Sequence, residues 1–247
     1  MAGLREAFEE RLFEVETYLD FLQSMEEQAR RGPPRLDGAR HPISVQQQKM
    51  LYSGVYLQLY NLIESTMTRC IDDIAGAAKS GETWKPQDLS EPLRAEWVRG
   101  MARTHVELTQ DNRLKAALEL CGHLMASLPI TEFRIEKGGG GNWDDQTIEH
   151  ISKRLGFQLN VSRTTMRGVK ERLRDDMGPL TLVKDLRNRL AHGSISFTEC
   201  AGEVSVDQLR DLKDKTVNYL REVVGCFVAY IDAFEYLAPE RRPVGAK

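Results

Sequence analysis

The sequence lacks several features that would assign it quickly to a class of protein. Its four cysteines form no Cys-x-x-Cys pair, which argues for a reducing compartment and against a structural zinc site. No run of 18 or more apolar residues is present, so we expect no transmembrane span. The charged, periodic N-terminus has no apolar stretch of the kind found in signal peptides. Together these absences favour a cytoplasmic protein.

A strong charge of one sign is also missing. The formal net charge is -3 and the sequence pI is about 6.0, so no global nucleic-acid signature is present. Any contact with phosphate groups must therefore come from a local patch. The chain has 247 residues and 41% hydrophobic content, which suffices for one large domain or for one domain with an insertion.

What the sequence does contain is helical periodicity. Apolar residues recur at steps of four and three from Leu4 to Met25 and predict an amphipathic helix over 3–30. That helix packs either on its own bundle or, as a coiled-coil-like seam, on a second copy. A capping pair, Ser44 and Gln47, opens an unusually long second helix over 44–78. Further helices are expected from Ser90 to about 108, over about 110–127, from Asp144 to Gly156, from Pro179 to His192, and over about 205–237.

The remaining segments predict irregular structure. Residues 76–92 favour a loop, 129–136 a short strand or an extended segment, and 194–198 a short loop or strand. The four glycines at 138–141 are followed by Asn142 and not by Gly-Lys-Ser/Thr, so a flexible loop is expected there instead of a phosphate cradle. His105 and His123 have no ligand at metal-binding spacing and are interpreted as structural histidines.

The most informative stretch is the predicted helix that ends near Gly193. Asn188 and His192 are four residues apart and therefore lie one turn apart on the same face, with Arg187 beside them. His192 falls in the last turn, where the helix dipole favours a protonated imidazole. Arginine is a fixed phosphate-binding group, and histidine can act as acid or base near neutral pH. Taken alone, the same pattern also fits an ordinary surface helix with a polar face.

Two other groups of residues could serve this stretch. Glu64 and Asn61 lie three residues apart beside the apolar face of the second helix. Glu64 is either a boundary residue or the partner of a buried arginine such as Arg187. A locally basic segment precedes the motif helix and is a candidate for steering a polyanion, although such a run also fits a solvated face. Its candidate RNA-binding residues are Arg163, Arg167, Lys170 and Arg174.

Three segments, at 59–66, 141–157 and 187–192, resemble in their sequence and in their order the HEPN superfamily (higher eukaryotes and prokaryotes nucleotide-binding domains). Arg187-Asn188, three further residues and His192 resemble its Arg-x4-His motif, and residues 59–66 resemble its long early helix with an acidic residue. Residues 141–144, followed by Ile148, Ile151 and residues 155–157, are similar to a segment that stand-alone prokaryotic members have between those helices. The resemblance spans roughly Ile43 to Asp232.

The resemblance implies an all-α helical bundle and a metal-independent endoribonuclease of a defence or toxin–antitoxin system. It implies a composite site at a homodimer interface, with Arg187, His192 and Asn188 catalytic and Glu64 and Asn61 supporting, and with no cofactor or metal. The expected partners are an RNA substrate, a second copy, and an antitoxin or regulatory protein. Ser194 stands where some HEPN toxins have a tyrosine that a partner nucleotidyltransferase modifies, which argues against that route of control. The alternatives are a non-catalytic RNA- or nucleotide-binding module and a purely structural helical protein.

We therefore predict a single domain over 1–247. Its core is formed by residues 44–78, 144–192 and 205–237, and it is flanked by the N-terminal helix and by an insertion over about 80–143 that contains helices between 90 and 128.

Overall fold

The computed structural model describes residues 2–35, 42–80, 84–137 and 142–243. Among these residues there is no β-strand, and the fold is all-α as predicted. The glycine loop predicted at 138–141 lies outside the described residues.

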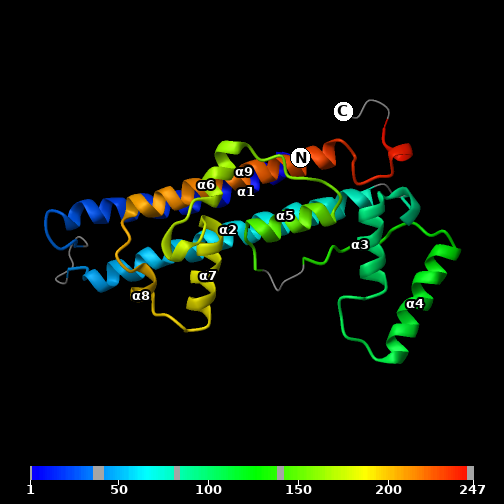
Figure 1. The fold of residues 1–247 in the computed structure, drawn as a ribbon, viewed down its shortest axis with the longest axis horizontal. Helices are drawn as coiled ribbons and strands as arrows, with labels where there is room; N and C mark the ends of the chain where they lie inside the picture. The colour runs from blue at the N-terminus through cyan, green and yellow to red at the C-terminus, as the bar shows by residue number, and fades with distance from the viewer. Residues whose placement is uncertain (1, 36–41, 81–83, 138–141, 244–247) are drawn as a thin grey trace.

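Three long helices run along the length of the molecule (Figure 1). They are α1 (Ala2–Ala29), α2 (Val45–Ser80) and α9 (Val206–Asp232), and each packs against the other two. Every apolar residue of the predicted α1 stripe, from Leu4 to Met25, is at most 4% exposed. The stripe is therefore buried within its own chain, which confirms the first of the two alternatives for this helix and removes the second.

The central helix α2 begins as predicted. The Ser44 backbone N–H donates to Gln47 Oε1 at 2.8 Å, and the Gln47 backbone N–H donates to Ser44 Oγ at 3.2 Å, which is a capping box. The helix continues to Ser80, so the prediction of a loop from Gly76 was wrong at its start. Ala75 and Ala78 are buried on this last stretch, and their packing outweighs the cost of a helical glycine.

Four shorter helices lie between α4 and α9 in the chain. They are α5 (Asp145–Arg154), α6 (Arg163–Lys170), α7 (Pro179–Ala191) and α8 (Phe197–Ala201), and α7 and α8 both pack on α2. Residues 194–196 form the predicted loop, but α8 begins at Phe197, so the prediction of a loop or strand was wrong for residues 197–198. Helix α8 forms because Ser196 and Glu199 make a capping box and because Cys200 and Ala201 are buried.

Helices α3 (Glu91–Met101) and α4 (Gln110–Met125) leave the far end of the bundle, and α4 lies clear of the long helices (Figure 1). Residues 130–137 have no regular secondary structure, so the short strand predicted as one alternative at 129–136 does not form there, and Phe133 and Ile135 are buried in the core. Helix α9 ends at Asp232 and not near 237, because Phe234 takes a positive φ of 54° and Leu237 bridges to Leu89.

Candidate functional site

Arg187 lies on α7 and points toward α2. Its Nη1 donates to Asn188 Oδ1 at 2.8 Å, and its Nη2 lies 3.5 Å from Glu64 Oε2. The guanidinium carbon is 4.1 Å from the centroid of the Tyr60 ring. The Arg187 side chain nevertheless remains 30% exposed, so these contacts hold the group in place without covering it.

Tyr60 forms the platform under this arginine. Its side chain is buried, and its hydroxyl accepts a hydrogen bond of 3.4 Å from the Trp143 backbone N–H. Burial raises the pKa of Tyr60, and the nearby Trp143 N–H and the Arg187 charge offset this only in part. The phenol therefore stays neutral, and a cation–π contact of this type is worth about 0.5–2 kcal/mol.

The segment Asn142–Asp144 connects the motif helix to the rest of the bundle. Asn188 Nδ2 donates to Asn142 Oδ1 at 2.9 Å, and Asp144 accepts a hydrogen bond from Lys184 Nζ. Lys184 and Asn188 lie one turn apart on α7, so consecutive turns of the motif helix contact this segment. Asn142–Asp144 therefore holds α7 in a fixed relation to Tyr60 and α2.

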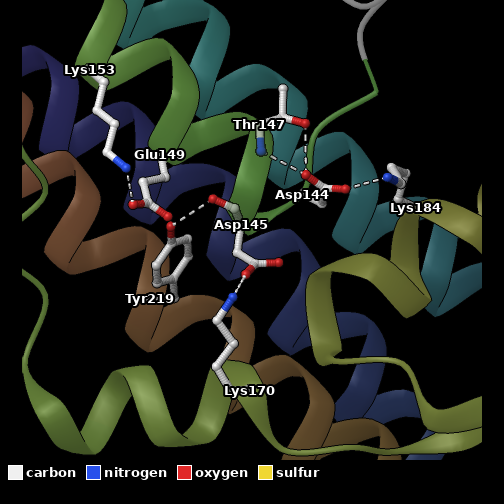
Figure 2. Close-up of polar contacts among 8 residues, drawn as sticks. All are labelled: Asp144, Asp145, Thr147, Glu149, Lys153, Lys170, Lys184 and Tyr219. Carbon is white, nitrogen blue, oxygen red and sulfur yellow. Dashed lines mark hydrogen bonds and ion pairs between the residues drawn. The ribbon is translucent and has the colours of Figure 1, made fainter.

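Asp144 also caps α5 (Figure 2). Its Oδ1 accepts from the Thr147 backbone N–H at 2.8 Å and from the Thr147 hydroxyl at 2.7 Å. Burial would raise the pKa of Asp144, but the hydrogen bonds from Lys184 and Thr147 outweigh it and the pKa lies below its ordinary value. A charged carboxylate thus joins the start of α5 to the middle of α7.

The neighbouring Asp145 connects two further helices (Figure 2). Its carboxylate pairs with Lys170 on α6, and its carbonyl accepts a 3.5 Å hydrogen bond from the Tyr219 hydroxyl on α9. The start of α5 is therefore anchored on α6, α7 and α9 within two residues.

His192 occupies a different position from the one predicted. It is the C-cap residue just beyond α7 and not part of the last turn, and its backbone N–H donates to the Asn188 carbonyl at 2.9 Å. The side chain is exposed and makes no hydrogen bond or ion pair with the residues that the structure describes. Gly193 follows with a φ of +67°, which ends the helix in the left-handed conformation that favours glycine.

The other predicted residues do not gather around Arg187. Asn61 is exposed and lines a hollow of about 480 Å³ between α1 and α2 with Tyr18 and Phe21. Of the basic residues, Lys170 pairs with Asp145, and Arg174 donates to the Cys200 carbonyl at 2.5 Å.

Arg163 and Arg167 are exposed on α6, and within the described residues neither makes an ion pair. Helices α6 and α7 pack on each other. In Figure 1, α6 crosses over α9, whereas α7 extends from the opposite side of α2. Of the four candidate RNA-binding residues, Arg163 and Arg167 are thus the two without a side-chain partner among the described residues.

Sequence reasoning missed three residues of this site: Tyr60, Asn142 and Lys184. One signal was present, since Tyr60 lies four residues before Glu64 and thus one turn away on the same face. Asn142 stands in the segment 141–144 that resembles the family, but its contact and that of Lys184 join positions 46 and 40 residues apart, and no local pattern indicates these partners.

Neither a metal site nor a membrane span is found in the described part of the chain. No group of three or more His, Cys, Asp or Glu residues there could hold a metal ion. None of its helices is both long and apolar enough to cross a bilayer.

The fold and the site together define a class: an all-α bundle in which a late helix presents Arg-x4-His opposite an acidic residue of a long early helix. A family model, HEPN_MAE_28990-like HEPN, matches residues 1–236, and the chain therefore belongs to the HEPN superfamily. The match includes α1 and the α3–α4 segment as well as the helices around the motif. No curated protein and no solved structure matches the chain significantly.

Proposed function

We propose that this protein is a metal-independent endoribonuclease whose active site forms from Arg187 and His192 of two copies. One observation supports this most directly. Arg187 is held on Tyr60, Glu64 and Asn188 and is still 30% exposed, while His192 is exposed just beyond the same helix. Metal-free RNA cleavage requires at least a fixed cation and an accessible imidazole, and α7 and its C-cap residue supply one of each.

The arginine keeps capacity for a phosphate. Its guanidinium has five N–H donors, and the contacts with Asn188 and Glu64 occupy two of them. The 3.5 Å separation from Glu64 is long for a charge-assisted hydrogen bond, so a phosphate oxygen competes for Nη2 at little cost. Tyr60 fixes the plane of the guanidinium while this exchange takes place.

The reaction would proceed by transfer within the ribose phosphate. One imidazole removes the proton from the 2′-hydroxyl, and the 2′ oxygen attacks phosphorus while Arg187 stabilises the added negative charge. The bond to the 5′ oxygen breaks, and a second imidazole donates a proton to that oxygen. The products are a 2′,3′-cyclic phosphate and a 5′-hydroxyl.

Two histidines are needed because one imidazole cannot accept and donate a proton in the same step. His192 is the histidine at this site, and a two-fold contact between copies would supply the second. Its exposed side chain, without an intramolecular partner among the described residues, is available for such a contact. Arg163 and Arg167 are exposed cations that could guide the RNA.

We place this activity in a defence or toxin–antitoxin system in the cytoplasm, on the basis of the superfamily to which the chain belongs. Such a nuclease requires control by an antitoxin or regulatory protein. Ser194 stands two residues after His192 and donates to the Arg189 carbonyl at 3.1 Å, so no tyrosine is present there for a modifying partner and control would come by another route.

A test is RNA cleavage in EDTA by the parent, Arg187→Ala and His192→Ala proteins. We expect each substitution to lower the rate by about 10²-fold or more, the usual contribution of acid–base or charge stabilisation. Arg189→Ala is the matched control, because Arg189 lies on the same helix, is 40% exposed and pairs only with Asp185 at 3.5 Å in the described residues. Equal rates in the parent and both site variants would exclude the proposed mechanism.

A second candidate is an RNA- or nucleotide-binding module without turnover. The observation that favours it is that the His192 side chain makes no hydrogen bond with Arg187 or with any other described residue of the protomer. This candidate predicts that Arg187→Ala weakens RNA binding while prolonged incubation of the parent yields no product. The same RNA substrate, assayed for binding and for cleavage, separates the two functions.

A further inference from the structure

Helix α4 is apolar on two opposite faces. The inner face packs toward α3 through Ala116 and Leu120, and the His123 ring lies 4.9 Å from the Trp97 ring. The outer face is open to solvent. Its residues, which we call the α4 seam, are Leu114, Leu118, Cys121 and Met125.

The α4 seam has the spacing of an interhelical contact. Its members follow one another at steps of four, three and four, which keeps them on one narrow stripe and is the a/d pattern of a coiled coil. Leu114, Leu118 and Met125 are 60%, 63% and 87% exposed. The apolar stripe of a helix normally faces a packing partner, so a second stripe on the face away from α3 indicates a second partner.

The seam is accessible to a large partner. Helix α4 lies clear of the three long helices at one end of the molecule (Figure 1), and α3 is the helix that it packs against. Leu124 and Leu128 beside the seam are 49% and 46% exposed and widen the apolar surface.

We propose that the α4 seam binds the α4 seam of a second copy, with the two helices antiparallel about a two-fold axis. When the axis passes between Glu119 and Leu120, Leu118 lies opposite the partner's Cys121 and Leu114 lies opposite the partner's Met125. These are the a-to-d pairs that an antiparallel coiled coil requires, so the stripe is complementary to itself.

The small residues beside the seam support this register. The same axis places Ala117 opposite the partner's Gly122. Apart from its own helix backbone, no described residue of the protomer has an atom within 4 Å of the position that a Gly122 Cβ would take, so packing within the protomer does not require glycine there. Glycine inside a helix costs about 0.5–1 kcal/mol of stability relative to alanine. Close approach of a second helix at Gly122 would explain why glycine stands there despite this cost.

The charges of α4 favour a protein partner of its own kind over a polyanion or a membrane. Asp111 and Glu119 balance Arg113 and Lys115, so the helix has no basic face for anionic lipid or RNA. Two such neutral helices also do not repel each other, and this is the charge condition for a contact between identical copies.

The area is sufficient for a specific contact. Five leucine and methionine side chains exposed to this degree amount to an apolar area on the order of 500 Å² per copy, in the range that marks interaction sites on monomers. Two copies would cover on the order of 1,000 Å² in total, the lower limit for a specific interface. The contact is therefore expected to be reversible and dependent on concentration.

Sedimentation of the full chain tests the contact, with Leu118→Glu as the disrupting variant. Leucine and glutamate have similar helix propensities, and Leu118 is 63% exposed, so the variant should fold. Asn112→Glu is the matched control, since it adds the same charge to the exposed part of α4 on the side away from the seam. We expect Leu118→Glu to lower the average mass twofold and Asn112→Glu to leave it unchanged. A parent that stays a 28.1 kDa monomer, or a Leu118→Glu protein with the parent's mass, overturns the proposal.

Disulfide trapping tests the register. In a Cys226→Ala background, Leu118→Cys should cross-link rapidly to the partner's native Cys121 under a mild oxidant, because Cys70 and Cys200 are buried. Adding Cys121→Ala should slow cross-linking at least tenfold. Equal cross-linking with and without Cys121 would mean that the two thiols introduced by Leu118→Cys meet each other, and this would overturn the antiparallel arrangement.

Discussion

The pair formed by Asp144 and Lys184 should stabilise the protein measurably, because it joins the start of α5 to α7 in a mostly buried place. The perturbation is Asp144→Asn and Lys184→Met, singly and together. Asparagine keeps the N-cap function toward Thr147 and removes only the charge, and methionine keeps most of the lysine stem. The double-mutant cycle therefore isolates the ion pair from capping and from packing.

The expected magnitude follows from the burial of the two groups. Breaking a fully buried pair costs about 3–5 kcal/mol. Here the Asp144 side chain is 10% exposed and that of Lys184 is 24% exposed, and Asp144 keeps both hydrogen bonds from Thr147. We therefore expect a coupling energy of about 1–2 kcal/mol, between the values for buried and surface pairs.

The assay is urea unfolding followed by far-UV circular dichroism, with a second cycle as control. Glu149 and Lys153 form a pair at 2.5 Å on the same helix (Figure 2), but their side chains are 51% and 58% exposed. The cycle of Glu149→Gln and Lys153→Met should give only a few tenths of a kcal/mol. If both cycles give the same coupling, burial does not determine the strength of the Asp144 pair and the reasoning fails.

Acid should remove the same stabilisation. The folded pKa of Asp144 lies below its ordinary value of 3.8, because the hydrogen bonds from Lys184 and Thr147 outweigh the effect of burial. The stabilisation is thus fully present above pH 3.8 and is lost as the pH falls through the lower, folded pKa. Asp144→Asn lacks this dependence, so the difference in unfolding free energy between parent and variant should shrink in acid. A difference that is constant down to the folded pKa and below it would contradict the shift.

Two further substitutions test the surroundings of Arg187. Tyr60→Leu removes the ring under the guanidinium and should lower RNA cleavage more than Tyr60→Phe, which loses only the hydrogen bond from the Trp143 N–H; equal effects in a cleavage assay would exclude the ring as a platform. In Gly193→Ala the added methyl group has room among the described residues, but the backbone must keep a φ of +67°. We therefore expect about 1 kcal/mol of destabilisation in urea unfolding, and an unchanged unfolding free energy would show that the turn relaxes.

The long helices could be predicted because their signals are local and repeated. The apolar stripe of α1 and the Ser44–Gln47 capping box of α2 are both read within one or two turns, and the structure confirms them. Helix α8 was not predicted, because a five-residue helix contains too few apolar positions to show a helical period. Its Ser196–Glu199 capping box was nevertheless present in the sequence. The end of α9 depends on Leu237 pairing with Leu89, a contact between residues far apart in the chain.

Within the candidate site, too, the residues that local patterns indicate could be predicted, and those that depend on distant contacts could not. Arg187, Asn188 and Glu64 were predicted from the motif and the resemblance, and the structure places these three side chains together. The support under them was not predictable, because Asn142 and Lys184 act across loops whose path the sequence does not determine. Whether His192 of two copies meets at one phosphate stays a prediction, since it depends on a contact between chains.

The two proposed contacts lie in separate parts of the molecule and can be tested independently. Helices α4 and α7 are far apart along the bundle (Figure 1), so one protomer can use α4 and the end of α7 at the same time. A chain with two different two-fold contacts forms either a closed tetramer or an open filament, and only the closed form reaches a constant mass as concentration rises. Because Leu118 is remote from Arg187, Leu118→Glu should halve the assembly and keep the cleavage rate per copy. Loss of cleavage in that variant would mean that pairing through α4 is what holds the two active-site halves together, and the α7 contact would then be too weak to form alone.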